Sequence, residues 1–132
     1  LGNPHSASLP IVSPAGLGFA KAETYNDLGV CYYELGNLDG ALENFNEATK
    51  ANPSYAQSYT NRGNCYRKLA THDATKLLSA QEDYTRAVEL DPTNPKSYNN
   101  RGALLLKMNQ YGEAFADFEK ALELQPSYEV AR

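Results

Sequence analysis

The sequence has no Trp, one Met, two Cys and two His among its 132 residues. Two cysteines are too few for the disulfide framework of a small secreted domain. The histidines, His5 and His72, leave little material for a metal site or a histidine-based catalytic site. No Gly-rich phosphate loop and no metal-ligand spacing is present. The sequence therefore predicts a protein that is not an enzyme and needs neither metal nor cofactor.

Two classes of partner are also disfavoured by what is missing. No apolar run reaches the roughly 18 residues of a membrane-spanning helix, so we expect no membrane insertion. Lys and Arg number 12 against 16 Asp and Glu, which gives a net charge of −4 at pH 7. A protein that binds nucleic-acid phosphates carries a basic excess instead, so we expect no nucleic-acid binding.

The first 20 residues contain no charged side chain. Prolines and glycines are concentrated there, at Pro4, Pro10, Pro14, Gly2, Gly16 and Gly18. This composition predicts an irregular arm or linker over residues 1–21, followed by one folded domain over residues 22–132.

Tyrosine, in contrast, is plentiful: there are ten, spaced regularly along the chain. A shift of about 34 residues aligns three segments in which aromatic or apolar residues flank a Gly, followed by Ala, an aromatic residue, Ala and Pro. The aligned residues are Tyr25, Gly29, Tyr32, Ala41, Phe45, Ala48 and Pro53; Tyr59, Gly63, Tyr66, Ala80, Tyr84, Ala87 and Pro92; and Tyr98, Gly102, Leu105, Ala114, Phe118, Ala121 and Pro126.

The spacing within each segment predicts two helices. Offsets of four and three residues place the members of each half on one helical face, and each Pro ends the second helix before the next segment begins. We expect the Gly of the first helix to face an Ala of the second. Two antiparallel helices would then approach closely while the aromatic rings fill the space beside them.

This pattern resembles the tetratricopeptide repeat (TPR) family, with Tyr at the fourth position of each unit where the family usually has Trp. The resemblance covers residues 22–128 and implies an all-α fold, a right-handed solenoid of three helix hairpins preceded by the irregular arm. The units would be residues 22–55, 56–94 and 95–128, with the start of a further helix at residues 129–132.

The second unit is longer than the others. Five extra residues fall between its two helices, near residues 70–76. We expect a longer loop or an extra helical turn there, with Asp73 as an N-cap. The insertion is interpreted either as a tolerated surface loop or as a protruding recognition feature.

Arg62 and Arg101 occupy the same position in units two and three. In both units the second helix carries an Asp, Asp83 or Asp117, one residue before its aromatic residue. Unit one has neither the Arg nor the Asp. This joint occurrence predicts an ion pair between the two helices of each of these units, so the arginines are poor candidates for ligand contacts.

Cys31 and Cys65 share one position in neighbouring units. Equivalent positions on stacked helices lie too far apart for a disulfide, which needs Cα atoms within about 7 Å. We therefore expect two buried thiols among core aromatic residues, and the free thiols favour a reducing intracellular compartment.

The resemblance to TPR domains also implies that the first helix of each unit lines a concave groove. The residues expected there are rich in Asn, whose amide can donate to and accept from the main chain of an extended peptide. In units two and three they include cations and no acids, which favours a ligand with an acidic end. The predicted groove residues are Asn26, Asn61, Asn64, Arg67, Lys68, Lys96, Asn99 and Asn100. The predicted function is thus a protein–protein interaction module, an adaptor or scaffold that binds a peptide or extended partner segment.

One known TPR site, the carboxylate clamp that holds the acidic C-termini of the large heat-shock chaperones, is matched only in part. Asn61 and Lys96 agree with it, whereas Asn26, Val30 and Asn100 stand at the other three of its five positions. With two of its cations missing, the clamp is not favoured.

Two other functions stay open. The sequence shows no polar helix that would cover the last apolar face of unit three, as stacked repeats require. The chain would then be an assembly or oligomerisation subunit that uses this uncapped C-terminal end, with another chain or the arm covering it. Alternatively, it is a regulatory TPR segment of a larger enzyme whose chemistry lies elsewhere.

Overall fold

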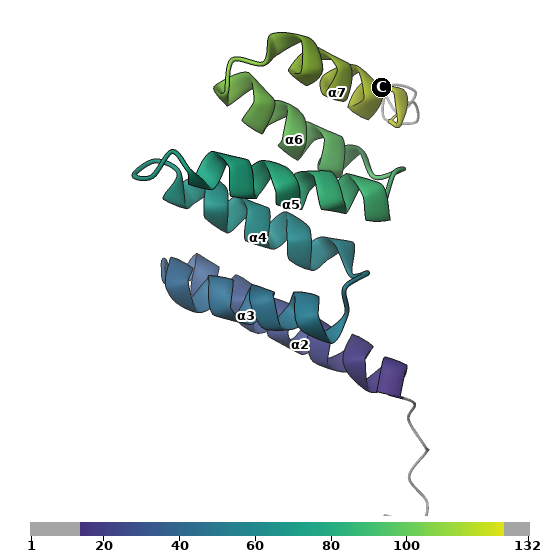
Figure 1. The fold of residues 1–132 in the computed structure, drawn as a ribbon. Helices are drawn as coiled ribbons and strands as arrows, with labels where there is room; N and C mark the ends of the chain where they lie inside the picture. Colours follow the sequence, from purple (N-terminus) through teal and green to yellow (C-terminus); the bar gives the residue numbers. More distant parts are fainter. Residues whose placement is uncertain (1–13, 126–132) are drawn as a thin grey trace, which may run out of the picture.

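The structure is a computed structural model that describes residues 14–125. This part of the chain consists of six α-helices and contains no β-strand. The helices are α2 (Pro14–Glu34), α3 (Leu38–Ala51), α4 (Ala56–Leu69), α5 (Lys76–Leu90), α6 (Pro95–Lys107) and α7 (Tyr111–Glu123). They form three antiparallel hairpins stacked in chain order, from the purple end to the yellow end of Figure 1. The predicted all-α solenoid is therefore confirmed.

The hairpins close through a contact between a glycine and an aromatic ring. A Cβ added at Gly29 would lie 2.4 Å from the ring of Phe45, and one added at Gly63 would lie 2.7 Å from the ring of Tyr84. At Gly102 the same Cβ would lie 3.0 Å from the ring of Phe118. The expectation that each Gly faces an Ala was wrong, because the ring of the second helix lies directly over the glycine of the first.

Neighbouring hairpins pack through hydrophobic clusters that are built from the same positions in each unit. Cys65 of α4 packs with Ala41 and Phe45 of α3. Leu104 of α6, at the position of Cys65 one unit later, packs with Tyr84 of α5. The second helix of each unit is therefore the surface on which the first helix of the next unit lies.

The predicted ion pairs are confirmed in both units. The guanidinium of Arg62 donates to both carboxylate oxygens of Asp83 at 2.8 and 2.7 Å, and Arg101 donates to both oxygens of Asp117 at 2.8 Å. Both carboxylates are buried. Burial raises the pKa of Asp83 in spite of its arginine partner, so the pair fixes helix packing at a considerable desolvation cost.

The predicted arm at residues 1–21 was wrong for its second part, because α2 begins at Pro14. Proline is well tolerated in the first turn of a helix, where its missing N–H would have no partner. Gly18, which the sequence suggested as a helix breaker, is a packing position: an added Cβ would lie 2.6 Å from the carbonyl oxygen of Ala51. Residues 1–13, and the predicted further helix at 129–132, lie outside the described residues.

The insertion in unit two lengthens the connection between α4 and α5. That connection spans residues 70–75, whereas the other hairpins turn within residues 35–37 and 108–110. The short turns each use a left-handed residue, Gly36 at φ 84° and Asn109 at φ 62°. The prediction of Asp73 as an N-cap was wrong, since its Oδ1 accepts hydrogen bonds from the N–H and hydroxyl of Thr75 in the turn before α5.

The two cysteines differ in exposure, so the expectation that both are buried was wrong for Cys31. Cys65 is 0% exposed, because unit one covers α4. Cys31 is exposed. The reason is that, among residues 14–125, no other helix packs against the corresponding face of α2.

None of the helices in this part of the chain combines the length and apolar content needed to cross a membrane.

We expect Arg101→Leu to lower the free energy of unfolding by about 3 kcal/mol, because it leaves the buried Asp117 without a partner. Unit one carries Leu28 and Asn44 at these two positions. The double variant Arg101→Leu with Asp117→Asn should therefore recover most of the loss. Urea unfolding followed by circular dichroism measures both variants. A double variant as unstable as the single one would show that the loss does not come from the unpaired, buried carboxylate of Asp117.

Burial raises the pKa of the Cys65 thiol to about 12, so this cysteine should resist thiol reagents in the folded protein. We expect one thiol per chain to react rapidly with a disulfide reagent near pH ~8 and the second to react only in denaturant. Cys31→Ser should remove the rapid phase, whereas Cys65→Ser should leave it. Two rapid equivalents in the wild type would show that Cys65 is accessible.

Candidate functional site

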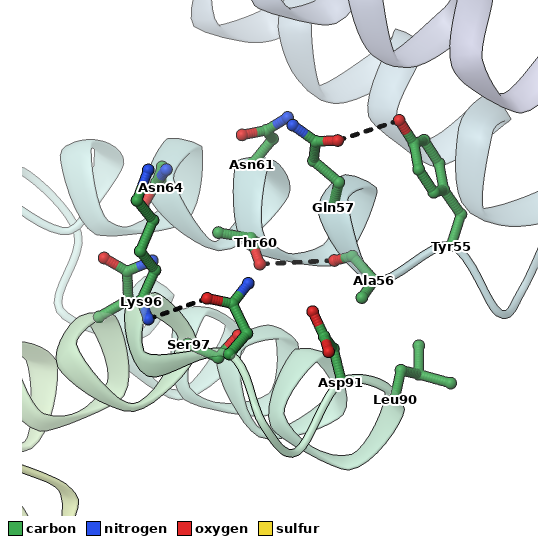
Figure 2. Close-up of a pocket in the computed structure, with 12 residues that line it drawn as sticks. Tyr55, Ala56, Gln57, Thr60, Asn61, Asn64, Leu90, Asp91, Lys96 and Ser97 are labelled. Atoms are coloured by element: carbon green, nitrogen blue, oxygen red, sulfur yellow. Dashed lines mark hydrogen bonds between the residues drawn. The ribbon is translucent and has the colours of Figure 1, made fainter. Parts of the chain in front are cut away.

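A polar hollow of about 690 Å³ lies between α4 and α6, on the side formed by the first helices of the units. We call it the groove hollow. Its lining residues are Tyr55, Ala56, Gln57, Thr60, Asn61, Asn64, Leu90, Asp91, Asn94, Lys96, Ser97 and Asn100. Figure 2 shows Gln57, Asn61 and Asn64 of α4 along one side and Lys96 of α6 on the other. Five of its ten polar side chains are amides, from Gln57, Asn61, Asn64, Asn94 and Asn100.

A second, smaller hollow of about 120 Å³ lies between α2 and α4. Its lining residues are Val30, Tyr33 and Glu34 of α2, Phe45 of α3, and Asn61 and Asn64 of α4. Because these two asparagines line both hollows, they stand at the middle of a surface that crosses all three first helices.

The amide of Asn61 is oriented by Asn26, which is 2% exposed. Asn61 Nδ2 donates to Asn26 Oδ1 at 2.9 Å, a bond between α4 and α2. Asn26 is therefore a buried helix-to-helix link beneath the surface. The bond directs the nitrogen of Asn61 toward α2, so its oxygen is the group that a ligand can use as an acceptor.

The amide of Asn64 is oriented in the opposite sense by Tyr84. The buried Tyr84 hydroxyl donates to Asn64 Oδ1. Burial raises the pKa of Tyr84 to about 12, so its hydroxyl remains protonated and keeps this donor role at neutral pH. With its oxygen occupied, Asn64 offers its NH₂ group as a donor.

The charges around the groove hollow are mixed. Lys96 lines it, and so does Asp91 from the connection between α5 and α6. The expectation that units two and three contribute no acid to the groove was therefore wrong. On the α2 side, burial and the negative charges of Glu23 and Asp27 raise the pKa of Tyr55. The cationic part of the hollow is thus the α6 side, at Lys96.

Of the predicted groove residues, Asn61, Asn64, Lys96 and Asn100 line the groove hollow. Arg67, Lys68 and Asn99 line neither hollow. The ammonium group of Lys68 lies 4.7 Å from the centre of the Tyr33 ring, a cation–π contact between units one and two.

The sequence-based prediction of the groove missed Tyr55, Asp91 and Asn94, which belong to the connections between units. Their sequence signal was their position after or beside the prolines that end each second helix, where the chain returns to the first-helix side. Asn94 is the N-cap of α6, since its Oδ1 accepts a hydrogen bond from the backbone N–H of Lys96 at 3.0 Å. Within residues 14–125, no group of three or more His, Cys, Asp or Glu side chains is placed to hold a metal ion.

Comparison with known proteins agrees with this architecture. A family model described as tetratricopeptide repeat matches residues 95–128, and a second, described as TPR repeat, matches residues 29–69 and 76–109. The gap between the last two ranges coincides with the insertion of unit two. No curated protein matches the chain at a significant level.

Several solved structures are similar. The first TPR domain of Spaghetti (RPAP3), bound to the HSP90 peptide SRMEEVD, is 30% identical with a TM-score of 0.75, and 82% of each chain is covered. The Arabidopsis OM64 TPR domain is 30% identical with a TM-score of 0.73, and the match covers 83% of this chain and 86% of that one. The second TPR domain of Spaghetti, bound to the same peptide, is 28% identical with a TM-score of 0.72, with 80% and 93% covered. The chain belongs to the tetratricopeptide repeat family.

Proposed function

We propose that the chain is a non-catalytic protein–protein interaction module that binds an extended segment of its partner across α2, α4 and α6. The observation that carries the proposal is the opposite orientation of two neighbouring amides. Asn61 presents an acceptor and Asn64 a donor, each held in place by a bond to a buried residue. An extended main chain offers an N–H and a C=O in alternation, which these two groups would bind without reading the side chains.

Lys96 would give the groove hollow a preference for a negatively charged group of the ligand. An acidic side chain or terminal carboxylate of the ligand would lie at Lys96, on the α6 side, away from Glu23 and Asp27 of α2. Asp91 lines the same hollow and weakens this attraction. The proposed ligand is therefore a segment held mainly through its main chain, with an acidic end as a secondary feature.

The related structures support a peptide ligand without fixing its identity. Two TPR domains of Spaghetti hold an HSP90 peptide whose sequence ends in Glu-Glu-Val-Asp. At the five clamp positions this chain has Asn61 and Lys96, but also Asn26, which is buried, and Val30 and Asn100, which are uncharged. We therefore propose that this chain binds such a chaperone tail weakly and acts as an adaptor or scaffold for other extended segments.

The proposal is tested with peptides selected on the wild type from a random display library. Their affinities are then measured by fluorescence anisotropy for wild type, Lys96→Ala and Asn100→Ala. We expect each substitution to weaken binding roughly tenfold, the effect of losing one hydrogen bond or ion pair of 1–2 kcal/mol. Neither change disturbs the Asn26–Asn61 or Tyr84–Asn64 bonds.

A matched control is Lys50→Ala, at an exposed lysine of α3 that borders a different hollow. It should leave the affinities unchanged. The peptide SRMEEVD and its C-terminal amide serve as defined probes, and we expect weak binding of both with little difference between them. Selected peptides that bind all variants equally would place the interaction outside the groove hollow, and strong, carboxylate-dependent binding of SRMEEVD would contradict main-chain recognition.

A further inference from the structure

Helices α2 and α7 lie at opposite ends of the described stack (Figure 1), and each carries exposed apolar residues. The first, here called the α2 face, consists of exposed residues on one stripe of α2, and the second, the α7 face, of exposed residues on α7. The α2 face comprises Leu17, Thr24, Leu28, Cys31 and Leu35. The α7 face comprises Tyr111, Phe115 and Leu122.

The equivalent face of α4, one unit later, is covered by a helix of the preceding unit. Thr24 and Cys31 are exposed, but Ser58 and Cys65 at the same positions of α4 are each 0% exposed. The difference is that α3, the second helix of the preceding unit, lies on α4. The α2 face is therefore a stacking face of the kind that accepts the second helix of another unit.

The α7 face is the complementary surface. Leu122 is 67% exposed, whereas Val88, at the same position of α5, is 9% exposed because it packs against Tyr98 of α6. Phe115 is exposed, whereas Leu42 at the same position of α3 is half-buried in the core shared with α4. The α7 face is therefore of the kind that accepts the first helix of another unit.

One pair of residues that would meet across these two faces is apolar on both sides. Inside the chain, Arg62 of α4 reaches across to unit one and donates to Asn46 and Thr49 of α3. At the ends, Leu28 replaces that arginine and Leu122 replaces Thr49, so an apolar pair stands where a polar pair stands between units one and two. Glu119 stands at the position of Asn46.

A hollow lies on α2 next to the α2 face. It has a volume of about 340 Å³ and is lined by Leu17, Ala20, Lys21, Thr24 and Tyr25. Tyr25 has the repeat position of Tyr98, which receives Val88 of α5 inside the chain. Leu122, at the position of Val88, would enter this hollow in the same way.

We propose that the α7 face of one copy docks on the α2 face of a second copy, as α3 docks on α4 within the chain. The contact joins different surfaces of the two copies, so it leaves one α2 face and one α7 face unused and permits further addition. The result is a concentration-dependent, head-to-tail extension of the stack by whole copies. This self-association uses surfaces distinct from the groove hollow.

The test uses the full chain and sedimentation velocity over the micromolar range, with two variants that each block one face. Leu28→Glu blocks the α2 face and Leu122→Glu blocks the α7 face, and the like charges prevent the two blocked faces from pairing with each other. Leu78→Glu is the matched control, since Leu78 is an exposed leucine of α5 outside both faces. Circular dichroism and thermal melting confirm that all variants remain folded.

We expect the wild type and Leu78→Glu to form a series of oligomers, whereas each blocked variant alone is a monomer. Mixing the two blocked variants should give a dimer with one copy of each, because one open face of each kind remains. A wild type that stays monomeric at every concentration would overturn the proposal. A blocked variant that still dimerises alone would overturn it in favour of a contact between like faces.

Discussion

The contact between a glycine and an aromatic ring is the constraint on which the rest of the structure depends. With Phe45, Tyr84 and Phe118 lying over Gly29, Gly63 and Gly102, the two helices of each hairpin can approach closely. Any side chain on those glycines would displace the ring, which is itself part of the core shared with the next unit for Phe45 and Tyr84. One local contact thus sets both the hairpin geometry and the stacking of units, and the stacking places α2, α4 and α6 side by side.

The repeat allowed much of the fold to be predicted, because its glycines, alanines and prolines recur in phase with the two helices. The Arg–Asp pairs were predictable for the same reason, since both partners are present together or absent together. What failed was local. Gly18 was predicted to be part of an irregular arm, because the sequence does not show that the carbonyl of Ala51, on another helix, lies close to it. Cys31 was predicted to be buried, because its position in the repeat does not show whether a neighbouring unit covers it.

Half of the predicted groove residues line the groove hollow, and the orientation of their polar groups was not predictable. The resemblance to TPR domains led to Asn61, Asn64, Lys96 and Asn100, but it did not show that Asn26 forms a buried hydrogen bond to Asn61. Amide orientation depends on partners 20 and 35 residues away in the chain, so it becomes visible only in three dimensions. Asp91 was missed because it lies in a connection between units rather than on a first helix. The outcome is a surface that offers one oriented acceptor and one oriented donor, with little net charge.

The most direct test of this account is a map of the side-chain amide resonances of Asn by nuclear magnetic resonance during titration with a selected peptide. Binding in the groove hollow should give large shifts for the NH₂ groups of Asn61, Asn64 and Asn100 and little change for Asn44 and Asn46, which line a different hollow. Shifts confined to residues 70–75, or to the exposed faces of α2 and α7, would contradict binding in the groove hollow.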